Sequence, residues 1–260
     1  MRAQIVLAVW TMLWLTSLAS AQDFRVSTKL YDELSEKNAN DPVAHSWSIF
    51  HAGKVYDHVD VVGETTVFDP AQKRFLILHP RRMIATVLAF DDIDQELYKS
   101  MRKAEQRVKN DPANTNTSAI AFQLTPAFQE SYDQSGKKLL LSSPHFRYEV
   151  RTATTDEDRR TAYLRYADWA AKLNYVLHPQ LLPNPRLKLN TALEKHKVLP
   201  TEIRLTSKIG NGLQLRAEHK FQWELTAQDR RQISDAESIL QNPQLKMLEF
   251  DDFQDSLAAR

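Results

Sequence analysis

One stretch of strict alternation, residues 213–224, constrains the fold of this chain more than any other feature. Its odd positions are apolar apart from one histidine, and its even positions are charged or amide: Leu213, Leu215, Ala217, His219, Phe221 and Trp223 against Gln214, Arg216, Glu218, Lys220, Gln222 and Glu224. Side chains alternate between the two faces of a strand, so this period of two predicts a strand with one apolar and one charged face. A sheet with one face in water is typical of antiparallel architectures.

Two hairpins and a further strand extend this prediction into the N-terminal half. The first hairpin joins residues 47–50 to residues 55–61 through a two-residue turn at Ala52-Gly53, and it would pair Trp47 with His58, Ile49 with Tyr56, and His51 with Lys54. The second joins residues 64–68 to residues 74–78 through a turn that suits type I geometry. Residues 83–90 are apolar and β-branched. Because these connections are too short for parallel crossovers, we expect an antiparallel meander.

Helical periodicity separates these strands. We expect a short helix at residues 28–36, and amphipathic helices over residues 92–108 and 155–177, the latter capped by Thr155 with Asp158. Thr226 with Asp229 predicts the start of another helix, and the acidic tail from residue 243 predicts a frayed helix or a partly disordered end. The fold class is therefore α+β: a curved antiparallel sheet, similar to a half-barrel meander, covered by α-helices.

Residues 68–80 align without gaps on residues 132–144, and a further strand and a helix follow each segment. This similarity indicates either a duplication or only the shared turn chemistry of hairpins. The polar residues 110–118 predict an exposed loop or a join between the two halves. We expect a single α+β domain over residues 22–260, ending in a C-terminal hairpin and helix.

The first 21 residues have the pattern of a secretory signal peptide. Arg2 precedes an uncharged apolar run, and Ala19-Ser20-Ala21 gives the small-x-small pattern that predicts cleavage at Ala21-Gln22. The apolar run is shorter than the roughly 20 residues of a membrane-spanning helix. The chain contains no cysteine, which excludes disulfides, thiolate metal sites and a lipid-anchoring cysteine. An exported chain without disulfides is typical of a bacterial periplasm, so we expect a periplasmic or extracellular location.

Composition excludes several functions. The 34 Lys and Arg residues balance the 33 Asp and Glu residues, whereas a nucleic-acid-binding protein needs a basic excess on one face. No second apolar run reaches membrane-spanning length, and Gly-x-Ser-x-Gly, His-Glu-x-x-His and glycine-rich phosphate loops are absent. We therefore expect no cofactor, no nucleic-acid partner and no transmembrane segment in the mature chain.

Aromatic residues on the predicted strands are the candidates for an apolar ligand cavity on the concave side of the sheet: Trp47, Tyr56, Phe75, Phe146, Tyr148, Phe221 and Trp223. Ordinary core packing is the alternative for such a set, because strands place alternate aromatic side chains inward in any case.

A polar cluster around the first hairpin gives a second candidate site. His51, Asp57 and His58 could form a metal or acid–base site of a hydrolase. His51 and His58 would share one face of the hairpin but lie several residue pairs apart. A metal needs three or more convergent ligands, so another segment would have to contribute.

The order of these elements, a signal peptide, an N-terminal helix, a long meander and covering helices, resembles the half-barrel fold of LolA-type periplasmic lipoprotein carriers. Residues 166–179 also resemble a segment of uncharacterised bacterial exported proteins. The resemblance to the carriers implies a cavity for acyl chains of a lipid or lipoprotein. We expect a non-enzymatic protein that binds such an apolar ligand or an envelope partner; the alternatives are an exported hydrolase and an interaction module without a cavity.

Overall fold

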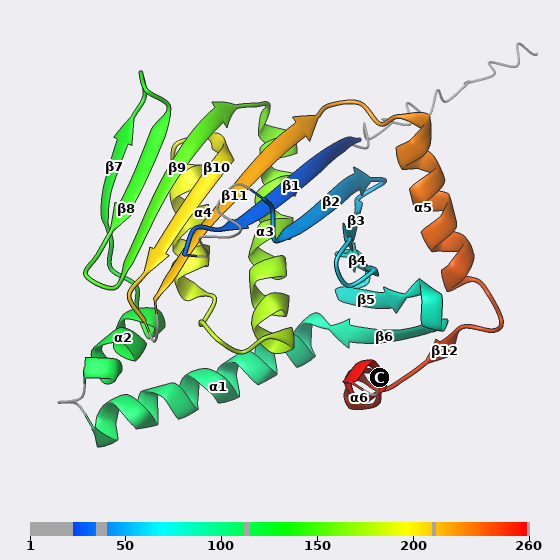
Figure 1. Cartoon of the computed structure of the whole chain (residues 1–260), viewed down its shortest axis with the longest axis horizontal. Coiled ribbons are helices and arrows are strands. Elements are labelled where there is room, and N and C mark those ends of the chain that lie inside the picture. The colour runs from blue at the N-terminus through cyan, green and yellow to red at the C-terminus, as the bar shows by residue number, and fades with distance from the viewer. Residues whose placement is uncertain (1–22, 35–40, 112–114, 210–211, 259–260) are drawn as a thin grey trace, which may run out of the picture.

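The computed structural model describes residues 23–34, 41–111, 115–209 and 212–258 (Figure 1). The signal peptide and cleavage site predicted from the sequence lie outside these residues. The turn residues Gly210 and Asn211 and residues 112–114 of the predicted loop also lie outside them.

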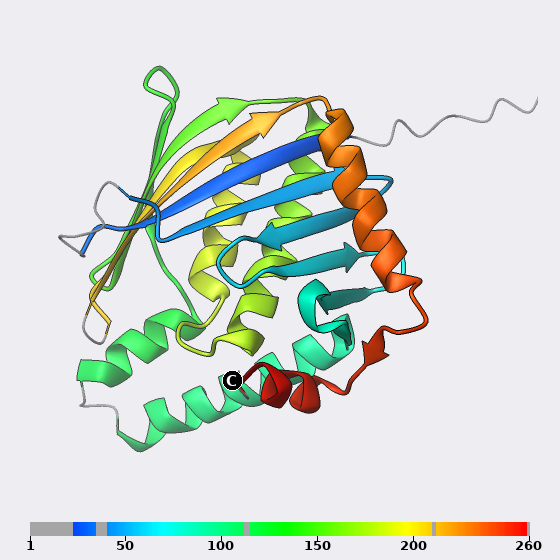
Figure 2. The ribbon, with the colours of Figure 1, turned by 45° about the vertical axis from the view of Figure 1, so that its right-hand side comes forward.

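The strands of the described residues form one twelve-stranded sheet, in the order β12-β6-β5-β4-β3-β2-β1-β11-β10-β9-β8-β7. Adjacent strands are antiparallel except for β12 beside β6, and the sheet curls around two helices (Figure 2). This architecture confirms the predicted α+β class. The strands are β1 (Phe24–Asp32), β2 (Ala44–His51), β3 (Lys54–Val59), β4 (Glu64–Asp69), β5 (Arg74–His79), β6 (Ile84–Ala89), β7 (Gln129–Asp133), β8 (Lys138–Ser142), β9 (Phe146–Thr154), β10 (Val198–Ser207), β11 (Leu213–Gln222) and β12 (Lys246–Met247).

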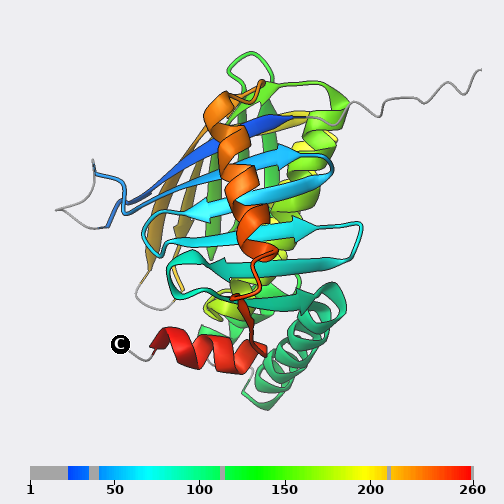
Figure 3. The same cartoon turned by 90° about the vertical axis from the view of Figure 1, so that its right-hand side faces the viewer.

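Helices pack on both faces of this sheet. Those of the concave side and its lower edge are α1 (Phe90–Asn110), α2 (Thr115–Leu124), α3 (Glu157–Leu177), α4 (Asn184–Lys195) and α6 (Phe250–Ala258), and a 3₁₀ turn, Pro80–Arg82, joins β5 to β6. Helix α5 (Ala227–Leu240) lies across the convex face (Figure 3). There Ile233 and Ala236 pack against Trp47, Ile49 and Tyr56.

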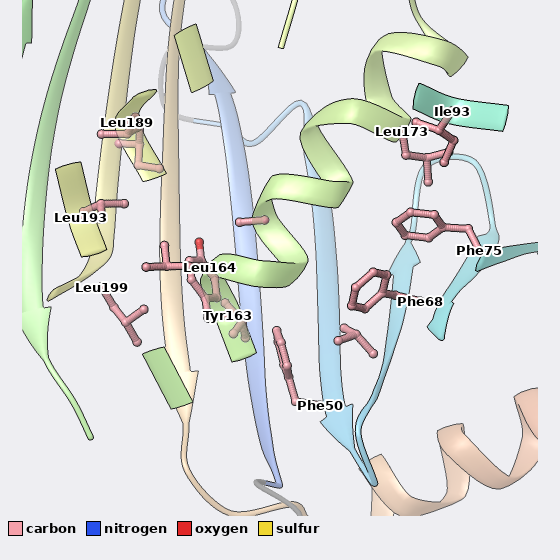
Figure 4. Close-up of a cluster of buried hydrophobic side chains, with 14 of the residues drawn as sticks. Phe50, Phe68, Phe75, Ile93, Tyr163, Leu164, Leu173, Leu189, Leu193 and Leu199 are labelled. Atoms are coloured by element: carbon pink, nitrogen blue, oxygen red, sulfur yellow. The ribbon is translucent and has the colours of Figure 1, made fainter. Parts of the chain in front are cut away.

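The main core lies on the concave side, between the sheet and helices α1, α3 and α4 (Figure 4). Aromatic rings from distant segments stack there: Phe24 on Phe50 with 4.0 Å between ring centroids, and Phe90 on Trp169 with 3.6 Å. Aromatic pairs contribute beyond the area that they bury. The first pair joins β1 to β2, and the second joins the start of α1 to α3.

The first hairpin has the register that the sequence predicts. Trp47 pairs with His58, Ile49 with Tyr56, and His51 with Lys54. Ala52 adopts a φ of 49° and Gly53 a φ of 77°, as a two-residue hairpin turn requires. Strand β3 ends at Val59, two residues before the predicted end.

Several local predictions are wrong. Residues expected to form a helix from residue 28 instead belong to β1, whose two edges pair with β2 and β11. Helices α2 and α4 were not expected, and α2 begins within the predicted polar loop. Asp156, rather than Thr155, caps α3. Of the two alternatives for the acidic tail, the structure shows the helix: residues 250–258 form α6, which is anchored by the buried Phe253.

The two segments that align in sequence form equivalent hairpins. Lys73 and Lys137 occupy the same turn position with φ of 50° and 51°. The carboxylate of Asp69 accepts from the backbone N–H of Gln72, and that of Asp133 accepts from Gly136 three residues on. Each hairpin is followed by a third strand and a long helix, β6 and α1 or β9 and α3. This geometry fits either origin, duplication or shared turn chemistry.

Asp229 connects α5 to the sheet, and its removal should destabilise the fold. Its fully buried carboxylate accepts from Arg25 of β1 at 2.6 Å and completes a capping box with Thr226. Asp229→Ala should lower the free energy of unfolding by about 3 kcal/mol, because it leaves a largely buried Arg25 unpaired and uncaps the helix. Urea unfolding measures this change. Asp235→Ala, at an exposed position of the same helix, is the control, and equal losses in the two variants would contradict the prediction.

Candidate functional site

A cavity of about 630 Å³ lies between the concave face of the sheet and the helices α3 and α4. Strands β1, β2, β3, β9, β10 and β11 form one wall, and α3, the connection at residues 178–183 and the start of α4 form the other. Ligand sites of small molecules are usually concave, mostly apolar and of about 300–1,000 Å³. The size and lining of this cavity match that description.

Small side chains on α3 leave this space open. Ala167, Ala170 and Ala171 face the strands across the cavity, where larger residues would fill it. On the opposite wall, Leu213 and Leu215 of β11 are only half-buried, because they face the cavity instead of a packed core. The alternating strand therefore directs its predicted apolar face into the cavity.

Only two of the seven aromatic candidates line the cavity, Phe146 and Tyr148 of β9. Trp47 and Tyr56 point to the convex face and pack under α5, because they occupy the opposite parity from Phe50 and Val55. Phe75 belongs to the closed part of the core, beside Phe68 and Phe90.

Phe221 and Trp223 also lie outside the cavity lining. Their rings stack on each other at 5.2 Å, and Arg159 lies over Trp223 at 5.0 Å. Trp223 also contacts Phe24. They therefore close one end of the core. Strand parity and position along the strand decide which aromatic residue reaches the cavity.

The histidines and aspartate of the first hairpin do not converge. Asp57 faces the cavity, whereas His58 lies on the opposite face and contacts Trp47 and Thr65. His51 forms a separate pair with Asp23 at 2.8 Å. Within the part of the chain that the structure describes, no group of three or more His, Asp or Glu residues could hold a metal ion.

Asp57 forms one polar position in the cavity. The hydroxyl groups of Ser48 and Tyr166 donate to its carboxylate. Burial raises the pKa of Asp57 to about 6, and these two hydrogen bonds act in the opposite direction. No cation lies within ion-pair distance of it among residues 23–34, 41–111, 115–209 and 212–258.

A second polar position brings together His219, Thr28 and Arg186. Nδ1 of His219 is 2.9 Å from the hydroxyl oxygen of Thr28, and Nε2 is buried without a hydrogen-bond partner in the described structure. Burial lowers the pKa of His219 to about 3, and the charge of Arg186 acts in the same direction. The imidazole is therefore neutral near pH 7.

Arg186 comes from the first turn of α4. Its Nε donates to the Asn190 side-chain oxygen at 3.1 Å, and its guanidinium bonds the Tyr163 hydroxyl. Sequence reasoning missed both Arg186 and His219 as site residues. His219 had a signal, since it is the one polar residue on the apolar face of the alternating strand. Arg186 had none, because α4 itself was not expected.

A scan against protein-family models and a search of curated proteins find no match to this chain. Among the helices of the described residues, none is both long enough and apolar enough to cross a membrane.

Asp57→Asn should change how stability depends on pH. The pKa of Asp57 is about 6 in the folded protein against an ordinary value of 3.8, so the folded state binds this proton more tightly than the unfolded chain. The resulting stability is present below about pH 4 and is lost as pH rises through 6, by about 3 kcal/mol in total. The variant should therefore exceed the wild type in stability at pH 8 by up to this amount, with little difference at pH 3.5.

Urea unfolding at the two pH values measures the difference. Asp60→Asn is the control, since the Asp60 side chain is about half exposed at the same hairpin. A constant difference between Asp57→Asn and the wild type at both pH values would refute the assignment of Asp57 as a buried, poorly compensated carboxylate.

Proposed function

We propose that this protein is a non-enzymatic, exported binding protein for an apolar ligand, a lipid or an acyl chain, which it holds in the concave cavity. The observation that carries the proposal is the cavity of about 630 Å³, lined mainly by Leu, Ala, Val, Ile and aromatic side chains. Removing an apolar ligand from water into such a lining is favourable in proportion to the apolar area buried.

The volume supports a ligand with one chain. A cavity of about 150 Å³ holds one benzene molecule, so this cavity has room for about 25 carbon atoms by the same measure. A fatty acid with a single chain fits that size. The several acyl chains of one lipoprotein anchor would exceed it unless part of them projected outside.

The signal-peptide pattern at residues 1–21 supports an exported location for this binding. Transfer of an apolar molecule through an aqueous compartment requires that the molecule be shielded from water, which a cavity between a sheet and helices provides. The hydrolase alternative has less support, because Asp57 and His58 lie on opposite faces of the sheet.

Filling the cavity should weaken ligand binding. Ala170 of α3 lines the cavity, so Ala170→Trp should place an indole in the ligand volume and weaken binding of the neutral fluorophore N-phenyl-1-naphthylamine at least 10-fold. Fluorescence titration measures this change. Ala227→Trp is the matched control, because Ala227 is exposed at the start of α5 on the convex side, and it should bind as the wild type does.

Native mass spectrometry of the protein purified from its own envelope gives an independent test. We expect a bound species of lipid mass in the wild type and its loss in Ala170→Trp. A wild-type protein that neither carries such a species nor binds the fluorophore would overturn the proposed function.

A further inference from the structure

We propose that the cavity selects a single-chain ligand with an anionic oxygen head group, a carboxylate or a phosphate, which Arg186 and His219 bind inside the protein. This inference rests on the proposed function and adds the chemistry of the ligand head. It assigns recognition to residues on α4 and β11, which lie far apart in the sequence and meet at the cavity.

Arg186 forms no direct ion pair in the described residues: the carboxylate that its charge influences, Asp168, is linked to it through the Asn190 amide. Arg186 lines the cavity, and its bonded partners, the Asn190 amide and the Tyr163 hydroxyl, are both neutral. In the described ranges, no carboxylate lies within ion-pair distance of its guanidinium. A guanidinium has five N–H donors. Donors therefore remain for a ligand, and a planar fork of this kind suits the two oxygens of a carboxylate or phosphate.

His219 supplies a second unused group, on the strand wall of the cavity opposite α4. Its Nε2 is buried and has no partner in the described structure, whereas Nδ1 is held by Thr28. When the Thr28 hydroxyl donates to Nδ1, Nε2 carries the hydrogen and is a donor. A buried donor without a partner costs about 1–3 kcal/mol. A ligand oxygen in the cavity would remove that cost.

Tyr163 connects the two groups into one site. Its hydroxyl bonds the Arg186 guanidinium, and its ring meets the His219 ring edge-on with 6.4 Å between centroids. Tyr163 is itself buried on α3, in contact with Phe50 and Phe221, and Figure 4 shows it directed from α3 toward the strands. The packed ring therefore holds both polar groups in fixed positions before a ligand arrives.

Asp57 lies apart from this site and does not oppose it. The Asp57 carboxylate is bonded by Ser48 and Tyr166 on the β2–β3 side, whereas Arg186 and His219 belong to α4 and β11. The cavity therefore separates its anionic and cationic groups. An anionic head is favoured at the Arg186 end, with its chain along the apolar wall that Leu205 and Leu215 help to form.

Displacement of N-phenyl-1-naphthylamine by three ligands with the same chain tests this inference: palmitate, hexadecyl phosphate and hexadecanol. We expect at least one of the two anions to bind 10-fold or more tightly than hexadecanol. The anion that binds more tightly identifies the head group, a fatty acid carboxylate or a lipid phosphate. Arg186→Met should reduce the preference for that anion over hexadecanol below 2-fold.

Lys188→Met is the matched control, since Lys188 is exposed on the same helix, and it should keep the full preference. Because Arg186 also bonds Asn190 and Tyr163, two further variants guard against misfolding. Arg186→Lys should retain part of the preference, and His219→Phe should reduce it about 3-fold or more while circular dichroism shows that the fold is retained.

Two outcomes separate the inference from the proposed function. Equal binding of all three ligands by the wild type, or an anion preference that survives in Arg186→Met, would overturn the head-group assignment and leave the apolar cavity as a binding site. Failure of the fluorophore and of all three ligands to bind would overturn both.

Discussion

The pairing of β1 in the middle of the sheet is the interaction on which the rest of the structure depends. One edge of β1 pairs with β2 along residues 24–30, and the other pairs with β11 along residues 25–32. Through these two ladders, the N-terminal meander and the strands of the C-terminal half become one sheet. Without β1 the sheet would divide into two separate sheets between β2 and β11, and its concave face would not be continuous. Val26, Thr28 and Leu30 of β1 also line the cavity directly.

Local features of the fold were predictable, and long-range ones were not. The hairpin registers follow from turn residues and from alternation close in sequence, as the pairs Trp47–His58 and Ile49–Tyr56 show. The sequence predicts a short helix at residues 28–36, whereas residues 28–32 belong to β1. β1 is a strand because it pairs with β2 and β11. The hydrophobic periodicity of nine residues carries no information about such long-range pairing. Helix α4 is short and begins at prolines, so it gives little periodic signal.

The candidate site was likewise predictable only in part. The sequence predicts that β11 turns an apolar face inward, and that face does line the cavity at Leu213, Leu215 and Ala217. The sequence does not show whether an inward aromatic side chain packs against a helix or lines a cavity, because that depends on the side chain opposite it. Trp169 of α3 stacks on Phe90 at 3.6 Å and closes the core, whereas Ala170, next in sequence, faces the cavity. Two adjacent residues of α3 therefore have different surroundings: Trp169 lies in the packed core and Ala170 lines the cavity.

The polar groups within an apolar cavity indicate that the cavity is more than a packing defect. A void left by imperfect packing would be lined by apolar atoms and would stay dry. This one contains Arg186 without a carboxylate partner in the described residues and an unpaired Nε2 of His219, both of which reduce stability unless something binds them. The alanine side chains of α3 leave room for a ligand. Arg186 of α4 provides a positive charge, and His219 of β11 provides a hydrogen-bond donor. Volume alone would accept any apolar molecule, whereas this combination favours one end of a ligand over the other and so orients it.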